Sequence, residues 1–135
     1  MSIKYLFILL ISSFFLACSS SATLTKKKVE ESTENMKLIA GEKYKNDFKI
    51  SYNPTGEFAI VLKRQVDYSK PIPDLKFFVF SLKEKQIIIE DSLAAGNVCW
   101  KEKYLIETFT REQKAEAPQS HDYLFNVKGK EYYFD

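Results

Sequence analysis

FVFSLKEKQIII, residues 78–89, contains two apolar runs joined by the turn Lys83-Glu84-Lys85. Phe, Val and Ile favour strands, and a short polar turn between two such runs is typical of a β-hairpin. The pattern returns without a gap as YLFNVKGKEYYF, residues 123–134, which also turns at a Lys-x-Lys sequence. An offset of roughly 45 residues indicates a repeated supersecondary unit.

The residues upstream of each hairpin predict a further pair of strands. Residues 48–52 alternate apolar and polar side chains, which indicates a half-buried strand. The turn sequence Asn53-Pro54-Thr55-Gly56 favours a type I turn that leads into a strand at residues 57–63. In the second half, residues 98–100 and 104–108 correspond to these two strands. Each half therefore reads strand, tight turn, strand, long loop, strand, tight turn, strand.

We therefore predict an all-β fold, an antiparallel meander of about eight strands in two four-stranded, blade-like units. The segments Tyr52–Ile60 and Phe78–Leu82 resemble the turn and strands of TolB-type β-propeller repeats. The resemblance covers residues 48–135 and implies two blades, which are too few to close a propeller ring. The unpaired sheet edges must then be protected from aggregation in another way: in a small sandwich, in a flattened barrel, or by a multimer that completes a ring.

The N-terminal segment has the layout of an export signal. Lys4 precedes the apolar run Tyr5–Ala17, which is shorter than the roughly 20 residues of a spanning helix. The sequence Leu16-Ala17-Cys18 resembles the lipobox of bacterial lipoproteins, which implies that Cys18 becomes the first residue and carries a lipid. In the enterobacterial pattern, an Asp directly after the lipidated cysteine implies retention in the inner membrane. Ser19 occupies that position here, so the resemblance implies the outer membrane. An ordinary cleaved signal with an incidental Cys18 is the alternative.

Three segments follow from this interpretation. Residues 1–17 are the signal peptide, residues 18–37 are the lipidated cysteine and a flexible polar tether, and residues 38–135 are a single β domain. Met36–Ala40 is expected to be a short strand that enters the domain.

The composition argues against several classes of function. Without Lys4, the chain keeps all but one of its 20 basic residues against 18 acidic ones, and nucleic-acid binding needs a clear basic excess. The single histidine has no recognisable nucleophile partner, so a serine or cysteine hydrolase site is not expected. One histidine and two cysteines do not make a zinc ligand set, and the four glycines form no phosphate-binding loop. We expect no catalytic residue, no metal and no cofactor. Cys99 is expected to be a small buried hydrophobe, and Trp100 a packed aromatic.

In a meander, successive connections between strands lie at opposite ends of the sheet. The sequence therefore predicts one end with tight turns and one end with long loops. The turns at residues 53–56, 83–85, 101–103 and 128–130 share the tight-turn end, and the links at residues 66–74, 91–97 and 111–122 share the long-loop end. Binding residues gather on long loops. The candidate partner-binding residues are therefore Tyr68, Pro71, Pro73, Asp74, Arg111, His121 and Asp122. Plain solvated connectors are the alternative interpretation of these loops.

The sequence thus predicts a lipid-anchored cell-envelope protein that is not an enzyme and acts as a binding or interaction module. Its expected partners are the membrane, through Cys18, and an envelope protein. A carrier of a small hydrophobic ligand, built as a lipocalin-like barrel, is an alternative because an eight-stranded meander can enclose one apolar molecule. An envelope inhibitor or immunity protein is another.

Overall fold

The computed structural model describes residues 19–69, 73–110 and 121–134, with the backbone alone described for residues 19–25, 121 and 122. One helix, α2 (Ser19–Tyr44), is followed by eight strands. The strands are β1 (Lys49–Tyr52), β2 (Phe58–Gln65), β3 (Asp74–Ser81), β4 (Gln86–Leu93), β5 (Gly96–Glu102), β6 (Leu105–Thr110), β7 (His121–Asn126) and β8 (Glu131–Tyr133). The prediction of an all-β meander is confirmed.

The strands form two antiparallel four-stranded sheets in chain order, sheet A from β1–β4 and sheet B from β5–β8. Equivalent backbone details recur in both sheets. Lys85 and Lys130 are the last residues of the two Lys-x-Lys turns, and both have a positive φ, 55° and 56° respectively. Leu82 N donates to the Glu57 carbonyl and Val127 N to the Tyr104 carbonyl, each at 2.9 Å. The two-unit organisation predicted from the sequence is therefore confirmed.

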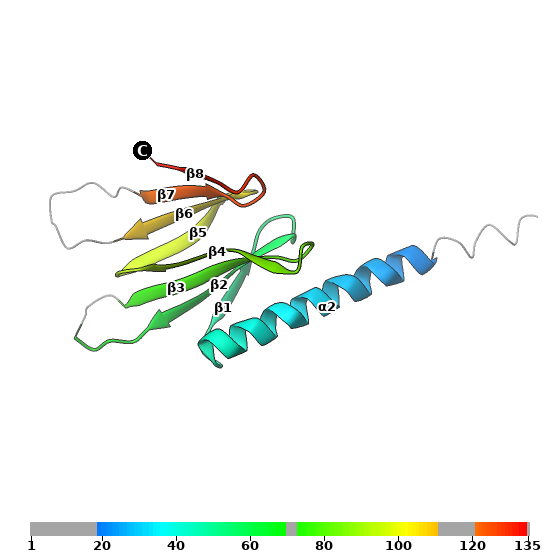
Figure 1. The fold of residues 1–135 in the computed structure, drawn as a ribbon, viewed down its shortest axis with the longest axis horizontal. Coiled ribbons are helices and arrows are strands. Elements are labelled where there is room, and N and C mark those ends of the chain that lie inside the picture. The colour runs from blue at the N-terminus through cyan, green and yellow to red at the C-terminus, as the bar shows by residue number, and fades with distance from the viewer. Residues whose placement is uncertain (1–18, 70–72, 111–120, 135) are drawn as a thin grey trace, which may run out of the picture.

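The two sheets pack face to face as a sandwich, and Figure 1 draws sheet B above sheet A. A single apolar cluster contains side chains from both sheets. Its buried residues are Ile60, Leu75, Phe77, Val79, Ile89, Leu93, Val98, Ile106, Tyr123, Phe125 and Val127. The described strands form two separate sheets and do not close into a barrel. The flattened-barrel alternative is therefore wrong.

A second apolar cluster lies on the other face of sheet A, beneath α2. Side chains four residues apart on the helix, from Ser32 through Met36 and Ala40 to Tyr44, are buried against that sheet. This spacing is the stripe by which a helix covers an apolar surface. The prediction of a flexible tether at residues 18–37 is wrong for residues 19–37, which are helical. The predicted strand Met36–Ala40 also lies in α2.

The two ends of the sheets have the predicted turns and loops, with two corrections. Figure 1 places the four hairpin turns at one end and the β2–β3 link at the other. The β4–β5 connection is only Ala94-Ala95, because β4 and β5 extend through most of the predicted loop 91–97. His121 and Asp122 begin β7 instead of closing a loop. Within the described residues, no helix has the length and apolarity to cross a membrane.

Candidate functional site

The structure places three of the predicted rim residues with their side chains. Tyr68 is 99% exposed after β2, and Pro73 is half-buried. Asp74 is the first residue of β3, and its Oδ1 accepts a hydrogen bond from Ala95 N at 3.1 Å. Since Ala95 has a φ of 49°, this bond supports the tight β4–β5 turn. Asp74 therefore has a structural role at the long-loop end.

The other predicted residues are not brought together by the described part of the chain. Cys18, Pro71 and Arg111 lie outside the described residues, and only the backbone of His121 and Asp122 is described. His121 is opposite Phe109 in the β6–β7 ladder. A partner-binding rim at the long-loop end stays a prediction, supported by the high exposure of Tyr68.

The face of sheet B that points away from sheet A is a second candidate, which the sequence reasoning missed. We define the outer face of sheet B by Cys99, Leu105, Glu107, Leu124, Asn126 and Tyr133. The register aligns Cys99, Glu107, Leu124 and Tyr133 across the four strands in one row. Because side chains alternate between the two faces of a strand, the members of such a row point to the same side.

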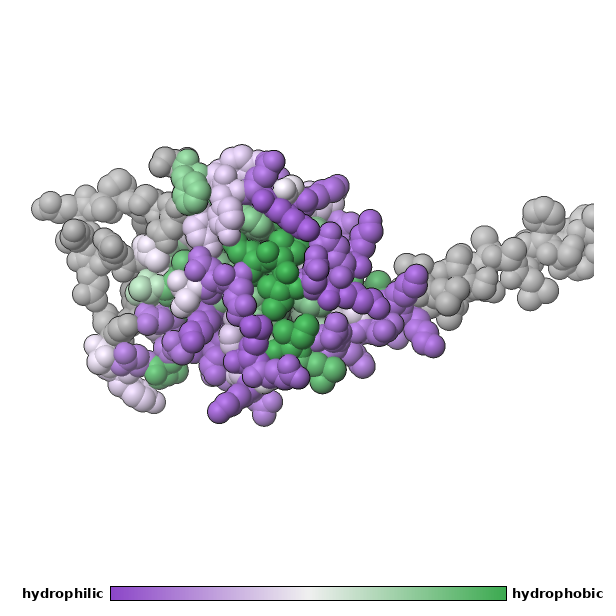
Figure 2. Space-filling model, in the orientation of Figure 1, coloured by the Kyte–Doolittle hydropathy of each residue, from purple (hydrophilic) through white to green (hydrophobic). Residues whose placement is uncertain are grey.

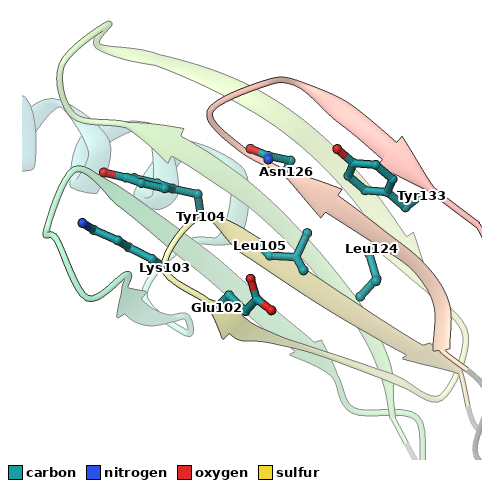
Figure 3. Close-up of a pocket in the computed structure, with 7 residues that line it drawn as sticks. All are labelled: Glu102, Lys103, Tyr104, Leu105, Leu124, Asn126 and Tyr133. Atoms are coloured by element: carbon teal, nitrogen blue, oxygen red, sulfur yellow. The ribbon is translucent and has the colours of Figure 1, made fainter.

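This face carries an open hollow of about 500 Å³. Figure 3 shows Leu105 and Leu124 at its floor, with Asn126 and Tyr133 along one border and Glu102 near another. The described helix lies on the far side of sheet A, so it does not cover this surface. Figure 2, in the orientation of Figure 1, shows an apolar strip in the middle of the view with hydrophilic side chains on both sides of it.

The outer face of sheet B carries an ion pair. Lys101 Nζ lies 3.2 Å from Glu107 Oε1, and the Glu107 side chain is only 15% exposed. Cys99 is exposed, so the prediction that it would be buried is wrong. Partial desolvation, followed by the neighbouring Glu107 carboxylate, raises the pKa of the Cys99 thiol. A raised pKa keeps the thiol protonated near neutral pH, which lowers its nucleophilicity.

Trp100 points to the opposite face of β5 and fulfils the expectation of a packed aromatic. Its ring packs against the core between the sheets. Its Nε1 donates a hydrogen bond to the Ser51 carbonyl of sheet A at 3.0 Å. Trp100 therefore joins the two sheets and is not a ligand platform on the outer face.

A smaller hollow of about 150 Å³ lies at the tight-turn end. Glu57, which lines it, accepts hydrogen bonds from Tyr104 Oη at 2.8 Å and Thr55 Oγ1 at 2.9 Å. These bonds, the one from Tyr104 being the larger cause, lower the pKa of Glu57. Lys128 Nζ lies 4.9 Å from the Tyr104 ring centroid. Such a paired and ionised carboxylate is suited to holding a turn, not to donating a proton.

Glu84, which also lines this hollow, is likewise paired and has a lowered pKa. Hydrogen bonds from Gln86 and then Lys130 lower its pKa, and Lys130 Nζ lies 3.4 Å from Glu84 Oε2. Among the side chains that the structure describes, no group of three His, Cys, Asp or Glu residues is close enough to hold a metal ion. The outer face of sheet B is thus the described surface best suited to recognition.

The comparisons with known proteins add no relative. No protein-family model, no curated protein and no solved structure matches the chain.

Proposed function

We propose that this protein is a lipid-anchored, non-enzymatic interaction module of the bacterial cell envelope, held to the membrane through Cys18. One observation carries the interaction role. Sheet A is covered on both faces, by α2 and by sheet B, whereas the described elements leave the outer face of sheet B open. An open sheet face with an apolar floor and polar borders is the usual construction of a protein-binding surface.

The chemistry of the described titratable groups supports a non-enzymatic role. Catalysis favours a thiol with a lowered pKa or a carboxyl with a raised one. Cys99 and Glu57 have shifts in the opposite directions.

The outer face of sheet B also defines the kind of partner. Leu105 and Leu124 offer an apolar centre, and the Lys101–Glu107 ion pair and Asn126 offer polar contacts beside it. A folded envelope protein with an apolar patch of matching size fits this surface, and an inhibitor or immunity role would use the same contacts. A lipocalin-like carrier has no support here, because large side chains such as Phe77, Ile106 and Phe125 fill the space between the sheets.

Metabolic labelling tests the anchor. Cells that express the full chain are grown with radiolabelled palmitate, and the label is expected on the protein. Cys18→Ser should remove the label, whereas Cys99→Ser should keep it. An unlabelled wild-type chain would contradict lipid anchoring.

Site-specific photo-crosslinking tests the binding surface. A photoreactive amino acid replaces Leu124 on the outer face of sheet B, and separately Tyr68 at the long-loop end, in the anchored full chain. A discrete adduct from Leu124 that Leu105→Glu removes would support the outer face. The matched control is Leu38, which is 68% exposed on α2 and lies outside both candidate surfaces. Equal labelling from Leu124 and Leu38 would reject a specific surface there.

A further inference from the structure

The direction of α2 relative to the sheets is fixed by contacts at both ends of its packed half. Ser32 Oγ donates a hydrogen bond to the Leu82 carbonyl at 2.6 Å, and Glu31 Oε1 lies 3.4 Å from Lys85 Nζ. These residues are therefore level with the β3–β4 hairpin turn. Near the other end of the helix, the Tyr44 carbonyl accepts a hydrogen bond from Lys63 Nζ in β2 at 3.0 Å. α2 thus runs along sheet A with its N-terminus toward the tight-turn end.

The N-terminal half of α2 extends beyond the sheets. Figure 1 shows this half projecting past the hairpin turns. Residues 26–31 are exposed, and the buried stripe of the helix begins at Ser32. At roughly 1.5 Å of rise per residue, the segment from Ser19 to Glu31 is about 20 Å long. Because this segment continues the packed C-terminal half of α2, it does not have to nucleate as an independent helix.

We propose that this projecting half of α2 is a stalk that sets the orientation of the molecule, so that the tight-turn end faces the bilayer and the long-loop end faces away. The inference rests on the proposed anchor at Cys18, which immediately precedes the helix. A lipid at that position puts the membrane at the far end of the stalk. The strands then point away from the membrane, and Tyr68 lies about one strand length, roughly 25 Å, beyond the tight turns.

Geometry, and not charge, sets this orientation. The tight turns do carry lysines whose sign suits anionic headgroups, namely Lys83, Lys85, Lys101, Lys103, Lys128 and Lys130. However, the Debye length is about 8 Å at physiological ionic strength, so attraction across about 20 Å is largely screened. Several of these lysines are also engaged, as Lys130 is with Glu84 and Lys101 with Glu107. The orientation should therefore not depend on anionic lipid.

Energy transfer to the membrane surface tests the proposal. In a Cys99→Ser background, a donor fluorophore is attached to Lys128→Cys at the tight-turn end or to Tyr68→Cys at the long-loop end. The processed, palmitate-labelled protein is placed in vesicles that carry acceptor lipids. Transfer should be clearly stronger from position 128 than from position 68, equally in neutral and in anionic vesicles. Equal transfer from both positions, or stronger transfer from position 68, would overturn the orientation.

A break in the stalk supplies the second arm. Glu30→Pro removes helical hydrogen bonding in the exposed half, and Glu30→Ala is its matched, helix-compatible control. The proline variant should reduce the difference in transfer between positions 128 and 68, and the alanine variant should preserve it. A difference that survives Glu30→Pro would reject the stalk. Failure of palmitate labelling would instead reject the anchor, so the two failures are distinguishable.

Discussion

At the scale of single residues, Tyr44 has the most unusual environment. Its side chain is 5% exposed, its ring lies 5.6 Å from that of Phe78, and its hydroxyl has no hydrogen-bond partner among the described residues. A buried polar atom without a partner costs free energy. We expect Tyr44→Phe to increase the free energy of unfolding by about 1 kcal/mol, measured by urea denaturation. A clear loss of stability would show that the hydroxyl has a favourable contact.

The same residue predicts a dependence on alkaline pH. Burial, and secondarily the Glu90 carboxylate, raises the pKa of Tyr44 to about 12 from 10.0. Between these values the unfolded chain loses the proton while the folded chain retains it. The titration of Tyr44 therefore leaves stability unchanged below pH 10 and lowers it as the pH rises toward 12. Unfolding measured across this window should show a smaller loss for Tyr44→Phe than for wild type, and parallel curves would contradict this account.

Two glycines form a matched pair with opposite expectations. A Cβ on Gly96 would lie 2.5 Å from Leu93 Cβ and 2.6 Å from the Phe109 carbonyl oxygen, whereas a Cβ on Gly41 would meet nothing within 4 Å. We expect Gly96→Ala to destabilise the protein by about 1–3 kcal/mol through overpacking. Gly41→Ala, inside α2, should stabilise it by about 0.5–1 kcal/mol. Thermal unfolding of both variants checks the two signs, and a tolerated Gly96→Ala would contradict the close approach of backbone and side chain.

At the scale of elements, the strands could be predicted from the sequence and the helix could not. Alternation of period two is a local property, and it placed β1 to β4 and the equivalent second set nearly where they occur. The Ser-rich and Thr-rich segment before Met36 has a weak helix preference and no acidic residue in its first turn. The buried stripe also contains the small residues Ser32 and Ala40. Only the apolar outer face of sheet A makes that stripe recognisable as a helix.

Packing, therefore, should hold α2 in place. Met36 is fully buried against sheet A, whereas Leu38 on the same helix is 68% exposed. Met36→Ala should lower the free energy of unfolding by about 2–5 kcal/mol. Leu38→Ala should change it by less than about 0.5 kcal/mol. Chemical denaturation compares the two, and equal effects would show that α2 does not cover the sheet.

At the scale of the whole molecule, hydrogen bonds hold one sheet against the other. Asn53, which is 4% exposed, donates from Nδ2 to the Lys103 carbonyl of sheet B at 2.9 Å and accepts at Oδ1 from Phe58 N at 3.0 Å. Asn126, by contrast, bonds within sheet B: its Oδ1 accepts hydrogen bonds from Lys128 N and Gly129 N of its own turn, and its side chain interacts with Tyr133 of β8. Asn53→Ala should therefore destabilise the protein by about 2 kcal/mol, more than Asn126→Ala does. A reversed order in unfolding measurements would place the coupling of the sheets elsewhere.

The candidate site was less predictable than the fold, for a reason that belongs to this scale. Tyr68 was correctly expected on an exposed loop, because Pro and polar residues mark such links locally. The outer face of sheet B was not predicted, because the strands that contain Leu105 and Leu124 have the same apolar–polar alternation as strands whose faces are covered. Whether a sheet face is covered depends on the layer next to it, and no pattern within a strand reports that layer. Cys99 was misjudged for the same reason.

The order of layers, α2, sheet A and then sheet B, has a consequence for modular growth. In architectures built from stacked units, each unit interacts chiefly with its neighbours, so stability accumulates unit by unit. Here the helix terminates the stack on one side, and sheet B leaves the other side without a terminator among the described elements. A third hairpin pair fused after Phe134 would therefore lengthen the stack without disturbing the contacts between the existing two sheets.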